Sequence, residues 1–253
     1  MPKNILITGA TSGFGKASAK IFAENGNNLI ITGRREDRLI ALQKELTEKH
    51  NIKVLCLCFD VRNQQETEKA INSLIEEWKN IDVLLNNAGL ASGFGKIQDG
   101  EIDDWNKMID TNIKGLLYVS RAVIPLMQQR KKGHIINIGS TAGKEVYENG
   151  NVYCASKHAV DAISKAMRIE LLKDQIKVTQ ICPGAAETEF SEVRFHQDKE
   201  KAKTVYNGYE PMTAKDVASV IYYTTTLPEN LCINDLVLTS LAQANSFYIN
   251  RNK

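Results

Sequence analysis

The first 25 residues carry the pattern that most restricts the fold: an apolar strand, a glycine-rich turn and a helix in direct succession. Asn4 to Thr8 is short and apolar, and the segment GATSGFG (residues 9–15) follows it. Lys16 to Asn25 then has apolar residues at helical spacing and stops before Gly26. The glycine spacing differs from the general G-x-G-x-x-G fingerprint, but glycines still allow a pyrophosphate close to the backbone, and a helix N-terminus offers it free N–H groups. The sequence therefore predicts a dinucleotide phosphate site.

Strands and helices continue to alternate with short connections. The further predicted strands are Asn28–Thr32, Lys53–Phe59, Asp82–Leu85, His134–Ile138, Ile176–Ile181 and Asp235–Thr239. The further predicted helices are Arg35–His50, Asn63–Trp78, Asp103–Arg130 in one or two pieces, Asn151–Leu172 and Thr213–Leu227. Nearly all-apolar strands are typical of parallel strands covered on both faces. We expect an α/β fold: a single doubly wound Rossmann domain over residues 1–253, with a mainly parallel seven-stranded sheet and helices on both faces.

The last quarter of the chain is less regular. Thr188 to Tyr209 has mixed charge and little periodicity, which is typical of a lid or substrate loop near a site. The tail from Gln243 to Lys253 is polar. We expect this tail to pack loosely or against another subunit.

Composition excludes several classes of function. The formal net charge is +2, and no basic block interleaved with aromatic residues suggests nucleic-acid binding. No run of 18 or more apolar residues predicts a membrane span, and the N-terminal apolar run is too short for a signal peptide. The five scattered cysteines, with Cys56 and Cys58 in an apparently buried strand, predict reduced thiols in a cytoplasmic protein. The four histidines lie far apart, so no metal site is expected.

Tyr153 and Lys157 stand four residues apart in the predicted helix Asn151–Leu172. On a helix this spacing places both side chains on one face, one turn apart. A nearby ammonium favours the phenolate and so lowers the pKa of a phenol. The pair therefore predicts a proton donor or acceptor, although a surface tyrosine beside a solvated lysine has the same spacing.

The second predicted strand ends in Gly33-Arg34-Arg35. An acidic residue at this point accepts hydrogen bonds from a ribose 2′-hydroxyl, whereas arginines pair with a 2′-phosphate. The arginines favour NADP(H) over NAD(H), and the alternative is that they are solvated residues at a helix start. Asp60 follows the third strand, where an acid could accept from the adenine amino group. The fourth strand runs into Asn86–Gly89, at the sheet edge where open α/β sheets bind ligands.

Together these pieces resemble the short-chain dehydrogenase/reductase family over almost the whole chain. The matching residues occur in the order and spacing of that family: Thr8-Gly9, Gly13, Gly15, Asp60, Asn86-Asn87-Ala88-Gly89, Asn112, Ser140, Tyr153, Lys157 and Pro183-Gly184. Four segments are similar to one branch, the NADP-dependent 3-hydroxy acid (serine 3-) dehydrogenases: residues 8–15, 32–35, 138–143 and 188–195. The local departures are Cys154, Ser156 and the Glu145–Gly150 loop, which leaves substrate identity less certain than reaction type.

The resemblance implies hydride transfer between the nicotinamide and a carbinol carbon, and it implies a role for each matching residue. The implied catalytic residues are Asn112, which holds a water of the proton relay, Ser140, which orients the substrate oxygen, Tyr153, the acid or base, and Lys157, which holds the nicotinamide ribose. The implied cofactor-binding residues are Gly9, Ser12, Gly13, Phe14, Gly15, Arg34, Arg35, Asp60, Val61, Asn87, Ala88, Gly89, Tyr153, Lys157, Pro183, Gly184 and Thr188. The substrate would contact Ser140 and Tyr153.

Members of the branch oxidise L-serine, L-allo-threonine and small 3-hydroxy acids, and these substrates need a partner for their carboxylate. Our hypothesis is Arg194, because a guanidinium binds a carboxylate bidentately; a solvated lid arginine is the alternative. Two other functions stay open: reduction of another carbonyl, such as a 3-ketoacyl thioester or a xenobiotic ketone, and dinucleotide sensing without catalysis. The family commonly forms tetramers through its long helices and C-terminal edge, so the resemblance also implies a homotetramer.

Overall fold

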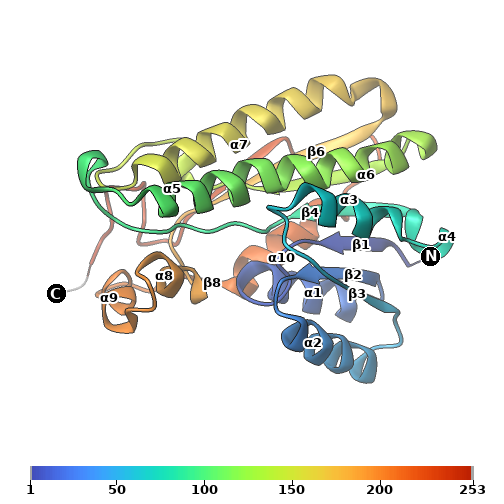
Figure 1. Ribbon diagram of the computed structural model, residues 1–253, viewed down its shortest axis with the longest axis horizontal. Coiled ribbons are helices and arrows are strands. Elements are labelled where there is room, and N and C mark those ends of the chain that lie inside the picture. Colours follow the sequence, from blue (N-terminus) through green and yellow to red (C-terminus); the bar gives the residue numbers. More distant parts are fainter. Residues whose placement is uncertain (1, 252–253) are drawn as a thin grey trace.

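A seven-stranded sheet organises the computed structural model, which describes residues 2–251 (Figure 1). The strand order is β3-β2-β1-β4-β5-β6-β9, and every neighbouring pair is parallel. The strands are β1 (Asn4–Ile7), β2 (Asn28–Gly33), β3 (Val54–Cys58), β4 (Ile81–Asn86), β5 (Gly133–Ile138), β6 (Ile176–Pro183) and β9 (Asp235–Leu238). The order reverses between β1 and β4, which is the switch point at which such sheets bind ligands.

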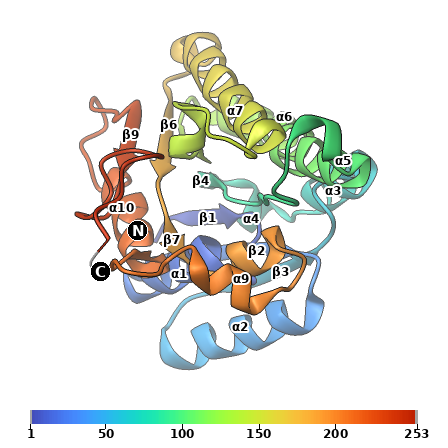
Figure 2. The same ribbon diagram turned by 90° about the vertical axis from the view of Figure 1, so that its left-hand side faces the viewer.

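Helices cover both faces of the sheet (Figure 2). One face carries α1 (Gly13–Glu24), α2 (Glu36–Lys49) and α10 (Ala214–Thr224). The other carries α3 (Gln64–Asn72), α4 (Glu76–Lys79), α6 (Leu116–Arg130) and α7 (Asn151–Glu170). The predicted doubly wound α/β fold is confirmed. No helix within residues 2–251 is both long and apolar enough to cross a membrane.

Strand β1 is apolar from Ile5 to Ile7 because helices cover both faces of the sheet around it. Ile5 and Ile7 pack against Phe22 of α1, whereas Leu6 between them faces the layer that contains Val123 of α6. Successive side chains of a strand point to opposite faces, so a strand with helices on both sides buries every position. This burial fixes β1 in the middle of the sheet, and the glycine turn that follows it lies at the carboxyl end of a central strand.

The predicted helix Asn63–Trp78 is wrong in one respect, because the chain breaks it into α3 and α4. The residue Ile75 is extended, with φ −73° and ψ 162°, and it caps the short α4. The Ser73 hydroxyl donates to the Ala70 carbonyl, which helps to end α3. The break allows Leu74 and Trp78 to be buried together against the sheet while the chain turns into β4.

The predicted segment Asp103–Arg130 forms α5 (Ile102–Ile109), a π-helical turn η2 (Asp110–Gly115) and α6 without interruption of the helical path. Pro125 lies inside α6 and does not end it. Proline removes the hydrogen bond to the residue four positions earlier, which is Arg121, and this residue is exposed to water. The extra residue of the π-helical turn matters for the site, because Asn112 lies within it.

The segment Thr188–Tyr209, which lacks periodicity in the sequence, contains two short helices. They are α8 (Glu189–Arg194) and α9 (Lys199–Thr204), and the two-residue strands β7 (Ala186–Glu187) and β8 (Met212–Thr213) pair at the base of this excursion. We call residues 188–205 the α8–α9 segment. In Figure 1, α8 and α9 lie beyond the left-hand end of the sheet.

The expectation of buried thiols in the third strand is wrong for Cys58, which is exposed, and Cys56 is only partly buried. The reason is topological, since β3 is the edge strand of the sheet. The predicted tail is described as far as Arg251, and Asn252 and Lys253 lie outside the described residues. Within it, Gln243 and Ile249 form an antiparallel bridge, and the Arg251 guanidinium stacks 5.0 Å from the ring centroid of Tyr209.

Candidate active site

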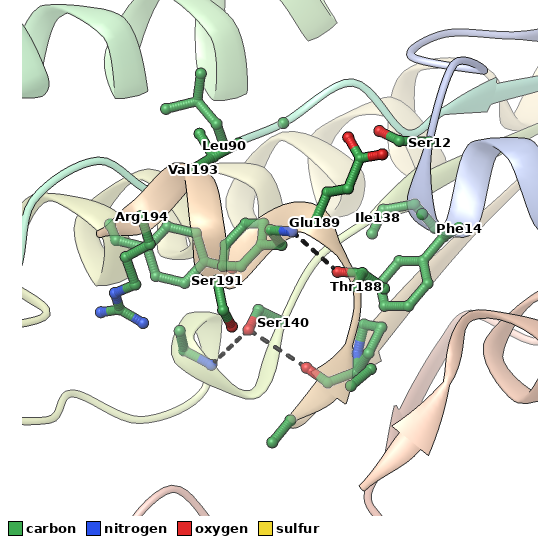
Figure 3. Close-up of a pocket in the computed structure, with 18 of the residues that line it drawn as sticks. Ser12, Phe14, Leu90, Ile138, Ser140, Thr188, Glu189, Ser191, Val193 and Arg194 are labelled. Atoms are coloured by element: carbon green, nitrogen blue, oxygen red, sulfur yellow. Dashed lines mark hydrogen bonds between the residues drawn. The ribbon is translucent and has the colours of Figure 1, made fainter. Parts of the chain in front are cut away.

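A cavity of about 730 Å³ opens at the carboxyl ends of β1, β4, β5 and β6, and α8 borders it (Figure 3). All the site residues predicted from the sequence line this cavity except Gly15 and Asn112. Segments far apart in the chain therefore meet here, because the carboxyl ends of parallel strands share one edge of the sheet. Residues of the C-terminal tail, including Ser246 and Arg251, also line it and were not predicted.

The glycine turn is built for close backbone approach. Gly9 has φ +66° and Gly13 has φ +51°, a region that side-chain-bearing residues rarely adopt. A Cβ at Gly15 would lie 2.4 Å from the Gly9 carbonyl oxygen, so Gly15 closes the turn from behind instead of lining the cavity. The Asn87 amide donates to the carbonyls of Thr8 and Gly9, at 2.9 and 3.2 Å, and ties the end of β4 to this turn. A bare backbone beside the N-terminus of α1 fits a dinucleotide pyrophosphate.

The two predicted arginines behave differently. Arg34 is largely exposed and lies 3.7 Å from Asp60, whose carboxylate also binds Arg62. Arg35 turns toward the glycine turn, where its Nε and Nη2 donate to the Thr11 hydroxyl at 3.1 and 2.7 Å. Both arginines line the cavity at the end that follows β2, together with Val61. This arrangement fits a cofactor with an extra phosphate.

Ser140, Tyr153 and Lys157 converge at the opposite end. Ser140 follows β5; its hydroxyl accepts from the Ala142 amide at 3.1 Å and donates to the Pro183 carbonyl at 3.3 Å. The Lys157 ammonium donates to the Ile138 carbonyl at 2.8 Å and lies 5.9 Å from the ring centroid of Tyr153. The spacing on α7 thus places both side chains at the cavity, as the sequence predicts.

Burial dominates the acid–base properties of this pair. It raises the pKa of Tyr153 well above its ordinary value; the nearby Tyr147 adds to the rise, and a hydrogen bond with Ser140 opposes it. Burial also lowers the pKa of Lys157 to about 8. The spacing alone predicts a lowered pKa for this phenol, and that expectation is wrong, because the cost of burying a phenolate dominates and raises the pKa.

Asn112 lies behind the site and is almost fully buried in η2. Its Oδ1 accepts from the Leu90 amide at 2.8 Å, and its Nδ2 donates to the Leu90 carbonyl at 2.8 Å and to the Ser156 hydroxyl at 2.9 Å. Ser156 in turn donates to the Tyr153 carbonyl at 2.8 Å. Asn112 thus braces the start of α7 against the strand end after β4, even though it does not line the cavity.

Arg194 lines the cavity from α8 (Figure 3), and three aromatic rings lie close to its guanidinium. Its guanidinium carbon lies 4.7, 5.4 and 5.6 Å from the ring centroids of Phe94, Tyr147 and Tyr153. Its Nη2 donates to the Tyr147 hydroxyl at 3.0 Å. Its Nε is buried and has no hydrogen-bond partner among the described residues. Tyr147 and Phe94 were not predicted individually, although Tyr147 belongs to the Glu145–Gly150 loop that departs from the family pattern.

The remaining predicted residues lie between these two ends. Thr188 caps α8, and its hydroxyl accepts from the Phe190 amide at 3.2 Å. The Phe190 ring packs edge to face on Tyr153, with their centroids 5.6 Å apart. Gly184 follows β6 at the cavity wall. Among the described residues, no group of three His, Cys, Asp or Glu side chains is arranged to hold a metal ion.

Comparisons with family models, curated proteins and solved structures all indicate the same protein family. Residues 3–199 match the short chain dehydrogenase family. The chain is 46% identical over 241 residues to NADP-dependent 3-hydroxy acid dehydrogenase YdfG of Salmonella typhi, covering 95% of this chain and 96% of that protein. It is 42% identical over 250 residues to Sulfoacetaldehyde reductase 2 of Chromohalobacter salexigens, covering 98% of each. The solved closed form of serine dehydrogenase complexed with NADP+ has a TM-score of 0.91 and 44% identity, covering 96% of this chain and 97% of that one.

A doubly wound parallel sheet with a glycine turn after its first strand defines the class of dinucleotide-binding α/β proteins. The chain belongs to the short-chain dehydrogenase family. It is an NADP-dependent oxidoreductase and is similar to the 3-hydroxy acid and serine dehydrogenases of that family. The resemblance, the enzyme class and the cofactor predicted from the sequence are confirmed.

Proposed function

We propose that this enzyme transfers a hydride between NADP(H) and the carbon that bears the 3-hydroxyl, or the corresponding carbonyl, of small 3-hydroxy acids. L-Serine, L-allo-threonine and 3-hydroxypropionate are the substrates we expect. The observation that carries the proposal is Arg194, a cation with an unpartnered buried Nε that lies beside Tyr153 inside the cavity. A 3-hydroxy acid has its carboxylate two bonds from the reacting carbon, so a short molecule can reach both side chains.

The three residues at the nicotinamide end have separable roles. The bound cofactor supplies or accepts the hydride at C4 of its nicotinamide. In the direction of reduction, Tyr153 gives its phenolic proton to the substrate oxygen, and its raised pKa keeps that proton in place at neutral pH. Ser140 orients the same oxygen by a hydrogen bond. Lys157 holds the nicotinamide ribose hydroxyls, and its ammonium favours the phenolate when Tyr153 acts as the base in oxidation.

The remaining predicted contacts follow the length of the cavity. We propose that Asn112 acts behind Lys157 on the proton path, because its Oδ1 and the Lys157 ammonium both border Gly89. We assign five groups of residues to the parts of the cofactor. Gly9, Ser12, Gly13, Phe14 and Gly15 form the turn around the pyrophosphate, and Arg34 and Arg35 bind the 2′-phosphate. Asp60 and Val61 border the adenine, Asn87, Ala88 and Gly89 the adenosine ribose, and Pro183, Gly184 and Thr188 the nicotinamide amide.

A substrate and cofactor panel tests the reaction. L-Serine, L-allo-threonine and 3-hydroxypropionate are offered with NADP+ or NAD+, and malonic semialdehyde and an acetoacetyl thioester with NADPH, while the absorbance of the reduced nicotinamide is followed. We expect turnover of the small acids with the phosphorylated cofactor. Turnover of the thioester alone would replace this proposal by the ketoacyl reductase alternative.

The role of Arg194 has its own test. The change Arg194→Ala should lower kcat/KM for L-serine by about 100-fold, because a charge-assisted hydrogen bond to a carboxylate is worth about 1.5–3 kcal/mol. Turnover of an uncharged analogue, the methyl ester of 3-hydroxypropionate, should change little. The matched control is Arg251→Ala, which removes another cavity arginine stacked on a tyrosine. An unchanged kcat/KM for L-serine in Arg194→Ala would refute the role.

A second candidate is reduction of sulfoacetaldehyde, because a relative of nearly full coverage carries that activity in its name and a guanidinium also binds a sulfonate. Sulfoacetaldehyde therefore belongs in the same panel. Comparison of kcat/KM for the sulfonate and the carboxylate at equal chain length decides which anion Arg194 prefers.

We also propose that the chain is a single domain, acts in the cytoplasm on a small molecule and assembles as a homotetramer. Apolar side chains support the assembly on two surfaces that contain the long helices and the last strand. Ile102 and Leu117, on α5 and α6, are 60% and 41% exposed, and Val237 on the edge strand β9 is 53% exposed. These apolar side chains would be removed from water if the two surfaces met another copy of the chain.

A further inference from the structure

Glu189, the first residue of α8, is paired with two arginines at the adenosine end of the cavity. Its Oε2 lies 3.1 Å from Nη1 of Arg35. Nη1 of Arg38 donates to both carboxylate oxygens, at 2.9 and 3.0 Å. Figure 3 shows Glu189 extending from α8 toward the glycine turn that carries Ser12. A carboxylate of the α8–α9 segment is thus held by side chains of α2 and the turn before it.

Hydrogen bonds to the glycine turn fix the guanidinium of Arg35 in the position where it contacts Glu189. Its Nε and Nη2 are held by the Thr11 hydroxyl, and Nη2 also donates to the Ser12 hydroxyl at 2.9 Å. The guanidinium is therefore fixed against the glycine turn, and Nη1 faces outward to Glu189. Arg34 contacts Asp60 instead. Glu189 consequently occupies the anion position offered by Arg35 and Arg38.

We propose that the Glu189 carboxylate and the 2′-phosphate of NADP(H) are alternative partners of Arg35 and Arg38. Glu189 is an internal competitor that weakens NADP(H) binding and speeds its release, and Arg38 is a further residue of the 2′-phosphate site. NAD(H) has no 2′-phosphate, so its binding leaves these ion pairs intact. Glu189 therefore sets how strongly the enzyme prefers the phosphorylated cofactor.

Charge and exposure support an exchange of partners. Partial burial tends to raise the pKa of Glu189, but hydrogen bonds from Arg35 and Arg38 outweigh it and hold that pKa below the usual value. The carboxylate is thus ionised throughout the neutral range. About 45% of the Glu189 side chain is exposed, and ion pairs at this degree of exposure are weak. A phosphate, with more negative charge, can displace the carboxylate from both arginines.

Loss of the Glu189 ion pairs would also affect the glycine turn, where we place the pyrophosphate. Thr188, which precedes Glu189 and caps α8, packs on the glycine turn: a Cβ at Gly13 would lie 3.7 Å from the Cβ of Thr188. Release of Glu189 from the arginines therefore loosens the start of α8 directly over this turn.

Equilibrium binding without substrate tests the competition. We expect Glu189→Gln to bind NADPH about fivefold more tightly in titration calorimetry, because it removes two exposed ion pairs that compete with the phosphate. Affinity for NADH should stay the same. The matched control is Glu192→Gln, which removes the same charge one turn further along α8 and should leave both affinities unchanged. Unchanged or weaker NADPH binding in Glu189→Gln overturns the proposal, and equal tightening in the control does so too.

The role of Arg38 is tested with fragments of the cofactor. Arg38→Gln should weaken the binding of adenosine 2′,5′-bisphosphate about tenfold and leave adenosine 5′-monophosphate unaffected, because only the first carries the 2′-phosphate. Equal effects on the two fragments would remove Arg38 from the site. These measurements need no substrate, so their failure leaves the proposed reaction untouched, and failure of the substrate panel leaves them untouched.

Discussion

At the scale of single residues, Lys157 shows a conflict between function and stability. Its ammonium group is buried and donates one hydrogen bond, to the Ile138 carbonyl. Burial holds its pKa at about 8, against 10.5 in water. Between these two pH values the unfolded chain therefore binds more protons than the folded protein, so the free energy of unfolding rises with pH. Below about pH 8 the folded protein bears the full cost of burying the charged lysine.

We expect Lys157→Met to raise the free energy of unfolding at pH 7 by about 3 kcal/mol while abolishing oxidoreductase activity. Chemical denaturation at pH 7 and at pH 10 measures the effect. The advantage of the variant should shrink at the higher pH, because Lys157 of the folded protein is neutral above about pH 8 and deprotonating the lysine of the unfolded chain costs less as the pH approaches 10.5. Lys165→Met, on the exposed side of the same helix, is the control and should change stability by at most about 1 kcal/mol.

Tyr153 shows what a local pattern cannot supply. Its spacing from Lys157 follows from helix geometry and was predictable. Its raised pKa results first from burial in the folded protein and then from the nearby Tyr147, and the hydrogen bond with Ser140 opposes the rise. A protein that keeps this phenol protonated at neutral pH holds a proton donor of the kind that the proposed carbonyl reduction needs.

At the scale of elements, β5 and β6 share a buried polar pair that links stability to pH. His134 Nε2 lies 2.7 Å from the Thr179 hydroxyl. Burial lowers the pKa of His134 to about 3, with lesser contributions from Lys177 and Lys3. The unfolded chain takes up a proton at this histidine near pH 6.5, so stability falls as pH drops from that value toward about 3.

We expect the wild-type protein to lose about 2 kcal/mol at this histidine between pH 6.5 and pH 5, because that interval spans about 1.5 pH units at 1.36 kcal/mol each. His134→Gln, which cannot titrate, should lack this part of the acid loss. His158→Gln on the exposed side of α7 serves as the control and should follow the wild-type profile. Urea unfolding at the two pH values gives the comparison, and parallel profiles for wild type and His134→Gln would contradict the assignment.

Helix continuity was the least predictable feature at this scale. The segment 63–78 has one helical period, yet the protein breaks it so that Leu74 and Trp78 are both buried. The segment 103–130 contains a glycine and a proline, yet it continues through the π-helical turn and places Asn112 against Leu90. In both cases packing against the sheet, which a local pattern does not contain, outweighs propensity.

At the scale of the whole molecule, the exposed apolar residues on α5, α6 and β9 make a prediction about assembly. A charge at Leu117 would be buried without a partner if the long helices pack against another copy. We therefore expect Leu117→Glu to lower the mass of the particle in light scattering from that of a tetramer to that of a dimer or monomer. Ile40→Glu on α2 is a matched control, since Ile40 is 53% exposed on the opposite layer. An unchanged mass in Leu117→Glu would exclude this surface.

Local patterns in the sequence predict the order of the strands and of the long helices, the glycine turn and the type of reaction. These features rest on local rules: the side-chain period of strands and helices, the freedom of glycine, and chemistry carried by residues such as Tyr153 and Lys157 at helical spacing. The same rules pointed to an anion-binding role for Arg34 and Arg35 from their place at a strand end.

Other properties arise when remote segments come together in the folded protein, because they depend on distance and burial. The tertiary structure raised the pKa of Tyr153, surrounded Arg194 with three aromatic rings, and brought Glu189 to Arg35 and Arg38 across more than 150 residues of chain. Desolvation and ion pairing act through space, so no local pattern contains them. For this reason the fold and the cofactor class follow from the sequence, whereas the contacts of Arg194 and Glu189, on which the proposals about substrate and cofactor exchange rest, appear only in the folded protein.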